Sequence, residues 1–462
     1  MRMTWLVMLL LVALAALRLT GLERHGIGID EAWDLTVIAL PPAQIITVLQ
    51  HPPNGVLWPP PLHYLVQHAV TRGGDLLPAA RMTAAGWNVA TLALLLLAAR
   101  RAPVAVQCAF AALFLLHPFQ QYWGQQTRGY AFLQFLTVAA YVALWQWRRS
   151  GISAWGMLLA MVLTAGLYTH YYFCLVWLVV ALLLLRWQWR RLLPVRAAVW
   201  VLLPILLFAP WLPTLMARVT DRHSTGAVRV TQPAVVAREL SLLLTGPLLP
   251  KMPSAQAARW LALGSGLLLL LLAARRWRRQ YWTLLPVLLP LAAAVLVGSQ
   301  VPTFAARYLI IILVPLYVLL ASTLDDPDRR WRRLAVLAVL IHGVGLAYGT
   351  AYLVRHEWPL ADDYRGAAAL IAGAQQPGDV VVCVAPYAAL PLRYYLPAVA
   401  CLDPAALPAT GSRRLWLVWS HWQYYDPTGG ILTGLCAARP LVREDNLPGV
   451  QVFLFGPATV TR

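Results

Sequence analysis

The chain has 462 residues, of which 60% are hydrophobic and only 12% are charged. This balance, with a mean hydropathy of +0.63, excludes an ordinary soluble globular protein and is typical of membrane proteins. The formal net charge is +19, but the basic residues cluster between hydrophobic runs and form no single basic stripe, which argues against a nucleic-acid-binding protein.

Hydrophobic runs long enough to cross about 30 Å of hydrocarbon occur throughout the first three quarters of the chain. We count about eleven and interpret the first as a retained helix, because no small-x-small cleavage site clearly follows it. The predicted spans lie near residues 3–19, 79–99, 102–118, 129–147, 152–168, 172–187, 197–215, 256–274, 281–298, 306–323 and 334–353.

Arginine clusters occupy alternate connectors between these spans, and the positive-inside rule places them on the cytoplasmic side. The remaining connectors, among them a long first outer loop at 20–78, then face outward together with the tail. The chain contains no Asn-x-Ser/Thr sequon, which favours a bacterial plasma membrane over an endoplasmic reticulum setting. The sequence therefore predicts a multi-pass protein of a bacterial plasma (inner) membrane with an extracytoplasmic C-terminal domain.

The tail after the last span changes in composition, so we divide the chain into a transmembrane domain at 1–353 and an α/β domain at 354–462. A capped helix is predicted at Asp362–Leu370, a turn at Gln376–Asp379 and a strand at Val380–Val384. A second helix is expected over 386–396, and further strands over 415–419 and 450–455. No phosphate loop or catalytic triad is visible in this domain, which suggests a packing or recognition role.

Five cysteines occur without any C-x-x-C spacing, which indicates neither a zinc site nor a redox pair. Three of them, Cys383, Cys401 and Cys436, belong to the tail. One disulfide is possible there, with one thiol left over.

Two adjacent carboxylates, Asp30 and Glu31, follow the first span directly, and Asp34 lies one turn later. Charged groups near a bilayer lose solvation, so such acids form a site hypothesis by default. The structural alternative is that Asp30 caps a short interfacial helix whose first turn carries acids.

The positive-inside rule predicts few arginines on the outer side. Several nevertheless occur where predicted helices start at that side: Arg81, Arg128, Arg259 and Arg307. An arginine beside a helix N-terminus is suited to a phosphate or pyrophosphate, whereas the alternative is snorkelling toward lipid headgroups. An outer carboxylate near outer arginines fits transfer from a lipid phosphate, with the carboxylate as general base and the arginines stabilising the leaving phosphate. No histidine pair shows a metal-ligand spacing, so no metal site is predicted.

Several stretches, taken in order, resemble GT-C glycosyltransferases of bacterial family 39, which are similar to protein O-mannosyltransferases and aminoarabinose transferases. The matching stretches are Asp30–Trp33, Pro60–Leu65, Gln125–Ala131, Tyr168–Tyr172 and Arg307–Leu309, with Asp363–Ala367 and Pro377–Asp379 in the tail. Two positions depart from the family pattern: Gln126 replaces an acid found in many relatives, and Pro59 replaces an expected histidine. Because His51-Pro52-Pro53 lies upstream, either proline segment is a candidate for the family's counterpart.

The resemblance implies an all-α polytopic GT-C protein with a small α/β outer domain that moves a sugar, with inversion, from a polyprenyl-phosphate donor. The acceptor would be a glycan, lipid or protein on the outer face. Asp30 maps to the catalytic base with Glu31 beside it, and Arg128 and Arg307 are the main candidates for the donor phosphate. Further phosphate candidates are Arg81 and Lys251, and the substrate-binding candidates are His63, Tyr64, Tyr130, His170, Tyr171 and Tyr308.

The resemblance implies no cofactor, although it does not exclude a divalent cation. The expected partners are the lipid-linked donor, the acceptor and membrane lipids, and no nucleic acid is expected. The alternative function is a polytopic transporter or flippase for a lipid-linked or anionic substrate. Transporters usually carry ionisable groups near the midplane and broken helices from internal repeats. Here the span centres hold few such groups, of which His342 is the main one, and no repeat is visible.

Overall fold

The computed structural model describes residues 2–52, 58–189, 198–219, 230, 232–246, 253–301, 303–355, 362–397, 400–404 and 413–458. The chain divides into two compact units. The first, which we call the helical unit, comprises Met1–Leu22 and Val37–Arg355. The second, which we call the tail unit, comprises Glu23–Thr36 and His356–Arg462.

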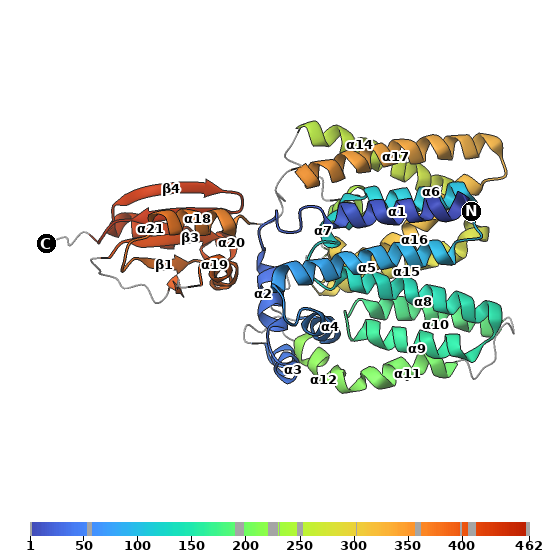
Figure 1. Cartoon of the computed structure of the whole chain (residues 1–462), viewed down its shortest axis with the longest axis horizontal. Coiled ribbons are helices and arrows are strands. Elements are labelled where there is room, and N and C mark those ends of the chain that lie inside the picture. Colours follow the sequence, from blue (N-terminus) through green and yellow to red (C-terminus); the bar gives the residue numbers. More distant parts are fainter. Residues whose placement is uncertain are drawn as a thin grey trace. The chain divides into compact units, whose positions relative to one another are not determined.

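The helical unit is built mainly from long apolar helices that run roughly parallel to one another (Figure 1). A helix overlaps each of the eleven predicted spans, and among the described residues six helices are long and apolar enough to cross a membrane. The long elements are α1 (Arg2–Leu19), α5 (Leu76–Ala98), α6 (Val104–Leu116), α8 (Tyr130–Ser150), α9 (Ser153–Leu167), α10 (Phe173–Trp189), α11 (Val199–Phe208) continued by η2 (Ala209–Trp211) and α12 (Leu212–Val219), α14 (Pro253–Ala274), α15 (Trp277–Gln300), α16 (Ile310–Ala321) and α17 (Arg329–Arg355).

Short helices connect these long ones, and the motifs at 30–33, 60–65 and 307–309 lie in or beside three of them. They are α3 (Pro42–Gln50), α4 (Leu62–Val70), α7 (Pro118–Trp123), α13 (Pro233–Thr245), η3 (Ala306–Leu309) and η4 (Ser322–Asp325), while α2 (Ile29–Ile38) crosses the boundary between the two units.

One buried arginine ties the start of the helical unit together. Arg18, at the end of α1, is fully buried, and its Nε donates to Asn88 Oδ1 of α5 at 2.9 Å. The same guanidinium donates to the Gln121 side chain of α7 and to the Phe114 carbonyl of α6. Asn88 in turn donates to Gln120 at 3.0 Å. A buried guanidinium is tolerated only when its donors are satisfied, so this network fixes α1 against three other helices.

The tail unit is a five-stranded mixed sheet in the order β2-β1-β3-β5-β4. β1 is parallel to β2 and β3, and β5 is antiparallel to β3 and β4. The strands are β1 (Val380–Cys383), β2 (Cys401–Leu402), β3 (Leu415–Ser420), β4 (Leu441–Leu447) and β5 (Val450–Phe455). The helices are α18 (Tyr364–Ala374), η5 (Pro386–Ala388), α19 (Ala389–Tyr395), α20 (Trp422–Tyr425) and α21 (Gly430–Ala438).

Alternation along the strands gives the sheet two apolar faces. Val381, Trp416 and Val452 pack with residues of α18 and α19 on one face. Residues one position along, such as Val382 and Leu417, pack with Leu435 of α21 on the other. The sheet therefore has helices on both sides.

The sequence located most of the buried elements of this unit. The predicted capped helix is α18, where Asp363 accepts from the Gly366 N–H at 2.8 Å. The predicted strands at 380–384, 415–419 and 450–455 correspond to β1, β3 and β5. The prediction lacked β2, β4, α20 and α21. β4 was missed because it is a largely exposed edge strand rich in charges, a composition that discourages edge-to-edge pairing and lacks an apolar alternation.

A disulfide joins Cys383 of β1 to Cys401 of β2, with a Cα–Cα distance of 5.8 Å that suits such a bond. Cys436 is an exposed free thiol. The structure thus contains the one disulfide and the one leftover thiol that the three tail cysteines allowed.

Replacing Arg18 by methionine tests the buried network. The substitution leaves the amide groups of Asn88 and Gln121 buried without their charged partner, so the free energy of unfolding should fall by roughly 2–4 kcal/mol. Reversible SDS-induced unfolding in mixed micelles measures this change. The exposed Arg100→Met variant is the matched control, and equal stability of the two variants would show that the network contributes nothing.

Candidate functional site

Direct contacts join three of the sequence motifs in the helical unit. The N–H of Leu62, the first residue of α4, donates to the Tyr168 carbonyl at 2.9 Å. His63, one residue later, is buried, and its Nε2 donates to the Thr127 carbonyl at 2.8 Å. Gly129 lies so near that a Cβ there would be 3.0 Å from the His63 ring. These contacts join the stretch at 60–65 to those at 125–131 and 168–172.

Aromatic rings from three motifs form one patch. The ring centroids of His170 and Tyr308 are 5.2 Å apart, and those of Tyr172 and Tyr308 are also 5.2 Å apart. Tyr130, the first residue of α8, lies 6.0 Å from His170 and 6.4 Å from Tyr308. We call these four side chains the aromatic patch.

Two guanidinium groups flank the aromatic patch. Arg128 lies 5.9 Å from the ring centre of Tyr130 and 5.7 Å from that of Trp58, and only 7% of the residue is exposed. Arg307 lies 5.1 Å from the ring centre of Tyr308. Cations over aromatic faces are attracted by the ring quadrupole, so the rings hold both charges beside the patch.

The histidines of the site are held neutral. Burial, followed by the charges of Arg128, Arg307 and His63, lowers the pKa of His170 to about 3. Burial also lowers the pKa of His63 to about 4, with a further contribution from Arg128 and an opposing one from the Thr127 hydrogen bond. At neutral pH the positive charge therefore resides on the arginines, and the imidazoles remain available as neutral hydrogen-bonding groups.

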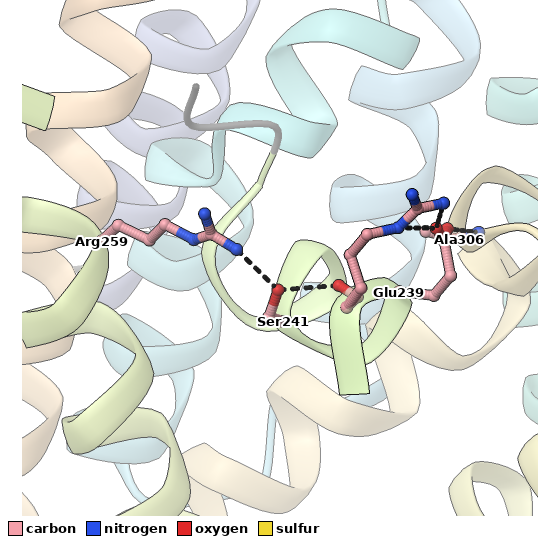
Figure 2. Close-up of polar contacts among 5 residues, drawn as sticks. Glu239, Ser241, Arg259 and Ala306 are labelled. Carbon is pink, nitrogen blue, oxygen red and sulfur yellow. Dashed lines mark hydrogen bonds and ion pairs between the residues drawn. The ribbon is translucent and has the colours of Figure 1, made fainter. Parts of the chain in front are cut away.

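A buried carboxylate, Glu239 of α13, positions the turn that carries Arg307. Its Oε2 accepts from the N–H of Ala306, the first residue of η3, at 2.8 Å, and its Oε1 accepts from Arg238 at 2.8 Å (Figure 2). Ser241, two residues later, donates to the Arg238 carbonyl and accepts from Arg259 at 3.0 Å. The sequence offers little indication of Glu239, whose only signal is a lone acid next to Arg238 in a mostly apolar segment.

The remaining candidates of the helical unit lie as follows. Arg81 is buried in α5 and donates to the Leu22 carbonyl. Tyr64 is buried beside His63, with 5.4 Å between their ring centroids. The Tyr171 hydroxyl accepts from Trp211 Nε1 at 3.2 Å. Lys251 lies outside the described residues.

The acidic stretch belongs to the tail unit. The guanidinium of Arg365 donates to the carbonyls of Glu23 and Arg24 at 2.7 and 3.0 Å, and the Ile27 N–H donates to the Tyr395 hydroxyl at 2.8 Å. Ile29 packs against the core that α18 and α19 form with the sheet.

The short helix considered as the structural alternative is present as α2. It begins at Ile29, so Asp30 and Glu31 lie in its first turn, and Asp30 is one residue inside the helix. Acids in a first turn suit the helix dipole. A stabilising position in the first turn does not by itself exclude a catalytic role for Asp30.

No side-chain cluster suited to a metal ion is apparent where the chain is described: groups of three or more His, Cys, Asp or Glu are absent from those residues. The chemistry that the helical unit offers is the binding of an anion by two arginines beside aromatic rings.

No protein-family model matches the chain, and no curated protein matches it in sequence. In structure it is similar to ArnT from Cupriavidus metallidurans, with a TM-score of 0.55 and 15% identity over 98% of each chain. ArnT bound to undecaprenyl phosphate gives the same TM-score and identity over 98% of this chain and 97% of that one.

The chain is also similar to the archaeal oligosaccharyltransferase AglB from Archaeoglobus fulgidus, in complex with an inhibitory peptide and a dolichol-phosphate. The TM-score is 0.51, with 10% identity over 97% of this chain and 74% of that one. The chain therefore has the fold of these proteins, which is the GT-C fold that the sequence resemblance predicted.

Replacing Glu239 by alanine tests its positioning role. The Ala306 N–H would be buried without its acceptor, which costs about 1–3 kcal/mol, so hydrogen exchange in η3 should accelerate. Mass spectrometry of peptides covering 303–309 measures the rate. Ser241→Ala, which leaves the Ala306 contact intact, serves as the control, and unchanged exchange in the Glu239 variant would contradict the role.

Proposed function

We propose that this protein is an integral-membrane glycosyltransferase. It takes a sugar from a polyprenyl-phosphate donor and passes it to an acceptor at the outer face of a bacterial plasma membrane. The shared fold supports this, because one ArnT structure holds undecaprenyl phosphate and the AglB structure holds a dolichol-phosphate.

The observation that carries the proposal is the pair of guanidinium groups beside the aromatic patch. Arg128 and Arg307 both act on His170, so their charges converge on one region of the helical unit. Guanidinium groups bind phosphate oxygens with charge-assisted hydrogen bonds, which strengthen where water is excluded. A lipid phosphate bound there would be stabilised further as it leaves the sugar, because its negative charge increases in the transition state.

Asp30 is the proposed general base. It takes the proton from an acceptor hydroxyl as that oxygen attacks the anomeric carbon from the side opposite the phosphate. The bond between the anomeric carbon and the phosphate oxygen breaks, the glycosidic bond forms with inversion, and polyprenyl phosphate leaves. Glu31 is the neighbouring carboxylate in the same helical turn.

The proposed orientation puts the tail unit on the outer side. Eleven spans with a cytoplasmic N-terminus give this orientation, and the arginine clusters agree with it. The Cys383–Cys401 disulfide also supports it, because such bonds persist in oxidising compartments.

Asp30→Asn should abolish transfer while donor binding survives. Loss of a general base lowers turnover by about 10²–10⁴-fold, measured as label moved from a polyprenyl-phosphate sugar by the protein in nanodiscs. Asp75→Asn, at an exposed acid of the same predicted outer loop, is the control. Wild-type turnover in the Asp30 variant would refute its role, and donor-lipid translocation without any transfer would favour the flippase.

Arg307→Gln should weaken binding of undecaprenyl phosphate by roughly 10–100-fold, the effect expected for one charge-assisted phosphate contact. Arg128→Gln should do the same, and raised salt should weaken wild-type binding. Microscale thermophoresis in detergent measures the affinity. The exposed Arg355→Gln variant provides the comparison, and equal affinities in all three variants would place the phosphate elsewhere.

A further inference from the structure

The tail unit contains a cavity of about 390 Å³ that the proposed chemistry has not used. Its lining combines two indole rings with amide, imidazole and carboxylate groups. The side chains that matter here are Asp362, Trp419, His421, Trp422, Asn446 and Gln451.

Three of these side chains form a row across the sheet. Trp419 of β3 pairs with Gln451 of β5, and Gln451 pairs with Asn446 of β4. Directly opposed residues of antiparallel strands share a face, so one indole and two amides lie side by side. The Gln451 amide donates to Asn446 Oδ1, which holds the two amides in register.

The indole rings supply a flat apolar surface. Trp419 and Trp422 stack with 4.9 Å between centroids and an interplanar angle of 11°. Trp419 also contacts the edge of Phe453 and packs on the adjacent core, whereas Trp422 belongs to neither core cluster. Trp422 is therefore the outer ring of the stack.

On the polar side of the cavity, one residue has a left-handed backbone conformation that residues other than glycine rarely adopt. His421 has a φ of +50°, and every other described residue with positive φ is a glycine. Its Nε2 lies 2.7 Å from Asp362 Oδ2. Gly449, with a φ of +73°, gives Asp362 its space, because a Cβ there would overlap the Asp362 carboxylate. Such backbone strain is concentrated at binding and catalytic sites.

We propose that this cavity binds a carbohydrate, which is the acceptor of the transfer. A pyranose ring presents an apolar C–H face that packs on an indole, and its hydroxyl groups both donate and accept hydrogen bonds. In this proposal, Trp422 packs against the apolar face of the sugar ring. The amides of Asn446 and Gln451 and the Asp362–His421 pair form hydrogen bonds with the sugar hydroxyls. A concave site with aromatic lining and a few convergent polar groups is the usual form of a small-ligand site.

Asp30 belongs to the same unit as this cavity. The hydrogen bond to Asp362 raises the pKa of His421, and the charge of Asp30 contributes to the same increase. Asp30 is therefore one of the charged groups of this unit that act on His421, which lines the cavity. The acceptor role rests on the proposed function, whereas the binding of a sugar does not.

The test is saturation-transfer difference NMR on the full chain in detergent micelles. The probes are the methyl glycosides of glucose, mannose, galactose and arabinose, with maltose, cellobiose and lactose. At least one sugar should give saturation transfer, strongest at the protons of one ring face. Trp422→Ala should weaken its binding roughly five- to tenfold, as loss of an aromatic contact predicts.

Tyr424→Ala is the control, because Tyr424 belongs to the same short helix as Trp422, is 78% exposed and does not line the cavity. It should bind as the wild type does. Absence of saturation transfer from every sugar, or wild-type binding by the Trp422 variant, would overturn the proposal.

A kinetic experiment separates this proposal from the proposed function. The sugar that binds should accept label from a polyprenyl-phosphate donor, with a KM raised five- to tenfold and kcat unchanged in Trp422→Ala. If the protein binds none of the sugars but transfers label to a lipid or a protein, the sugar site is refuted and the proposed glycosyltransferase activity is retained. Sugar binding without transfer to any acceptor would support the site and contradict the glycosyltransferase.

Discussion

The attraction between two guanidinium groups and the aromatic rings beside them is the interaction on which the proposed phosphate site depends. Arg128 and Arg307 come from distant parts of the sequence, and removing such charges from water is costly unless the surroundings compensate. Tyr130, Tyr308 and Trp58 supply ring faces, and Glu239 fixes the turn before Arg307. A phosphate anion is a ligand that suits these two groups, because guanidinium forms charge-assisted hydrogen bonds with phosphate oxygens.

The residues that we propose for transfer belong to two compact units. The arginines belong to the helical unit, whereas Asp30 belongs to the tail unit, where Arg365 and Tyr395 bind the segment just before it. In the proposed reaction the acceptor sugar and its general base are held by one unit and the lipid-phosphate donor by the other.

Sequence reasoning succeeded where a local pattern carries the information. Apolar runs located the long helices, and the ordered motifs named His63, Arg128 and His170 as site candidates without predicting which of them would be in contact. It failed where a single polar residue acts through distant contacts, as Arg18 and Glu239 do, because neither has a repeating pattern. It also separated the stretch at 23–36 from the tail domain, since that association depends on hydrogen bonds spanning more than three hundred residues.

The most direct test of the account is an experimental structure of the full chain with a non-transferable polyprenyl-phosphate sugar analogue. The account predicts phosphate oxygens within about 3 Å of the Arg128 and Arg307 guanidinium nitrogens. It also predicts that the Asp30 carboxylate faces the anomeric carbon on the side opposite the phosphate. A phosphate bound away from both arginines, or an Asp30 side chain turned away from the sugar, would contradict it.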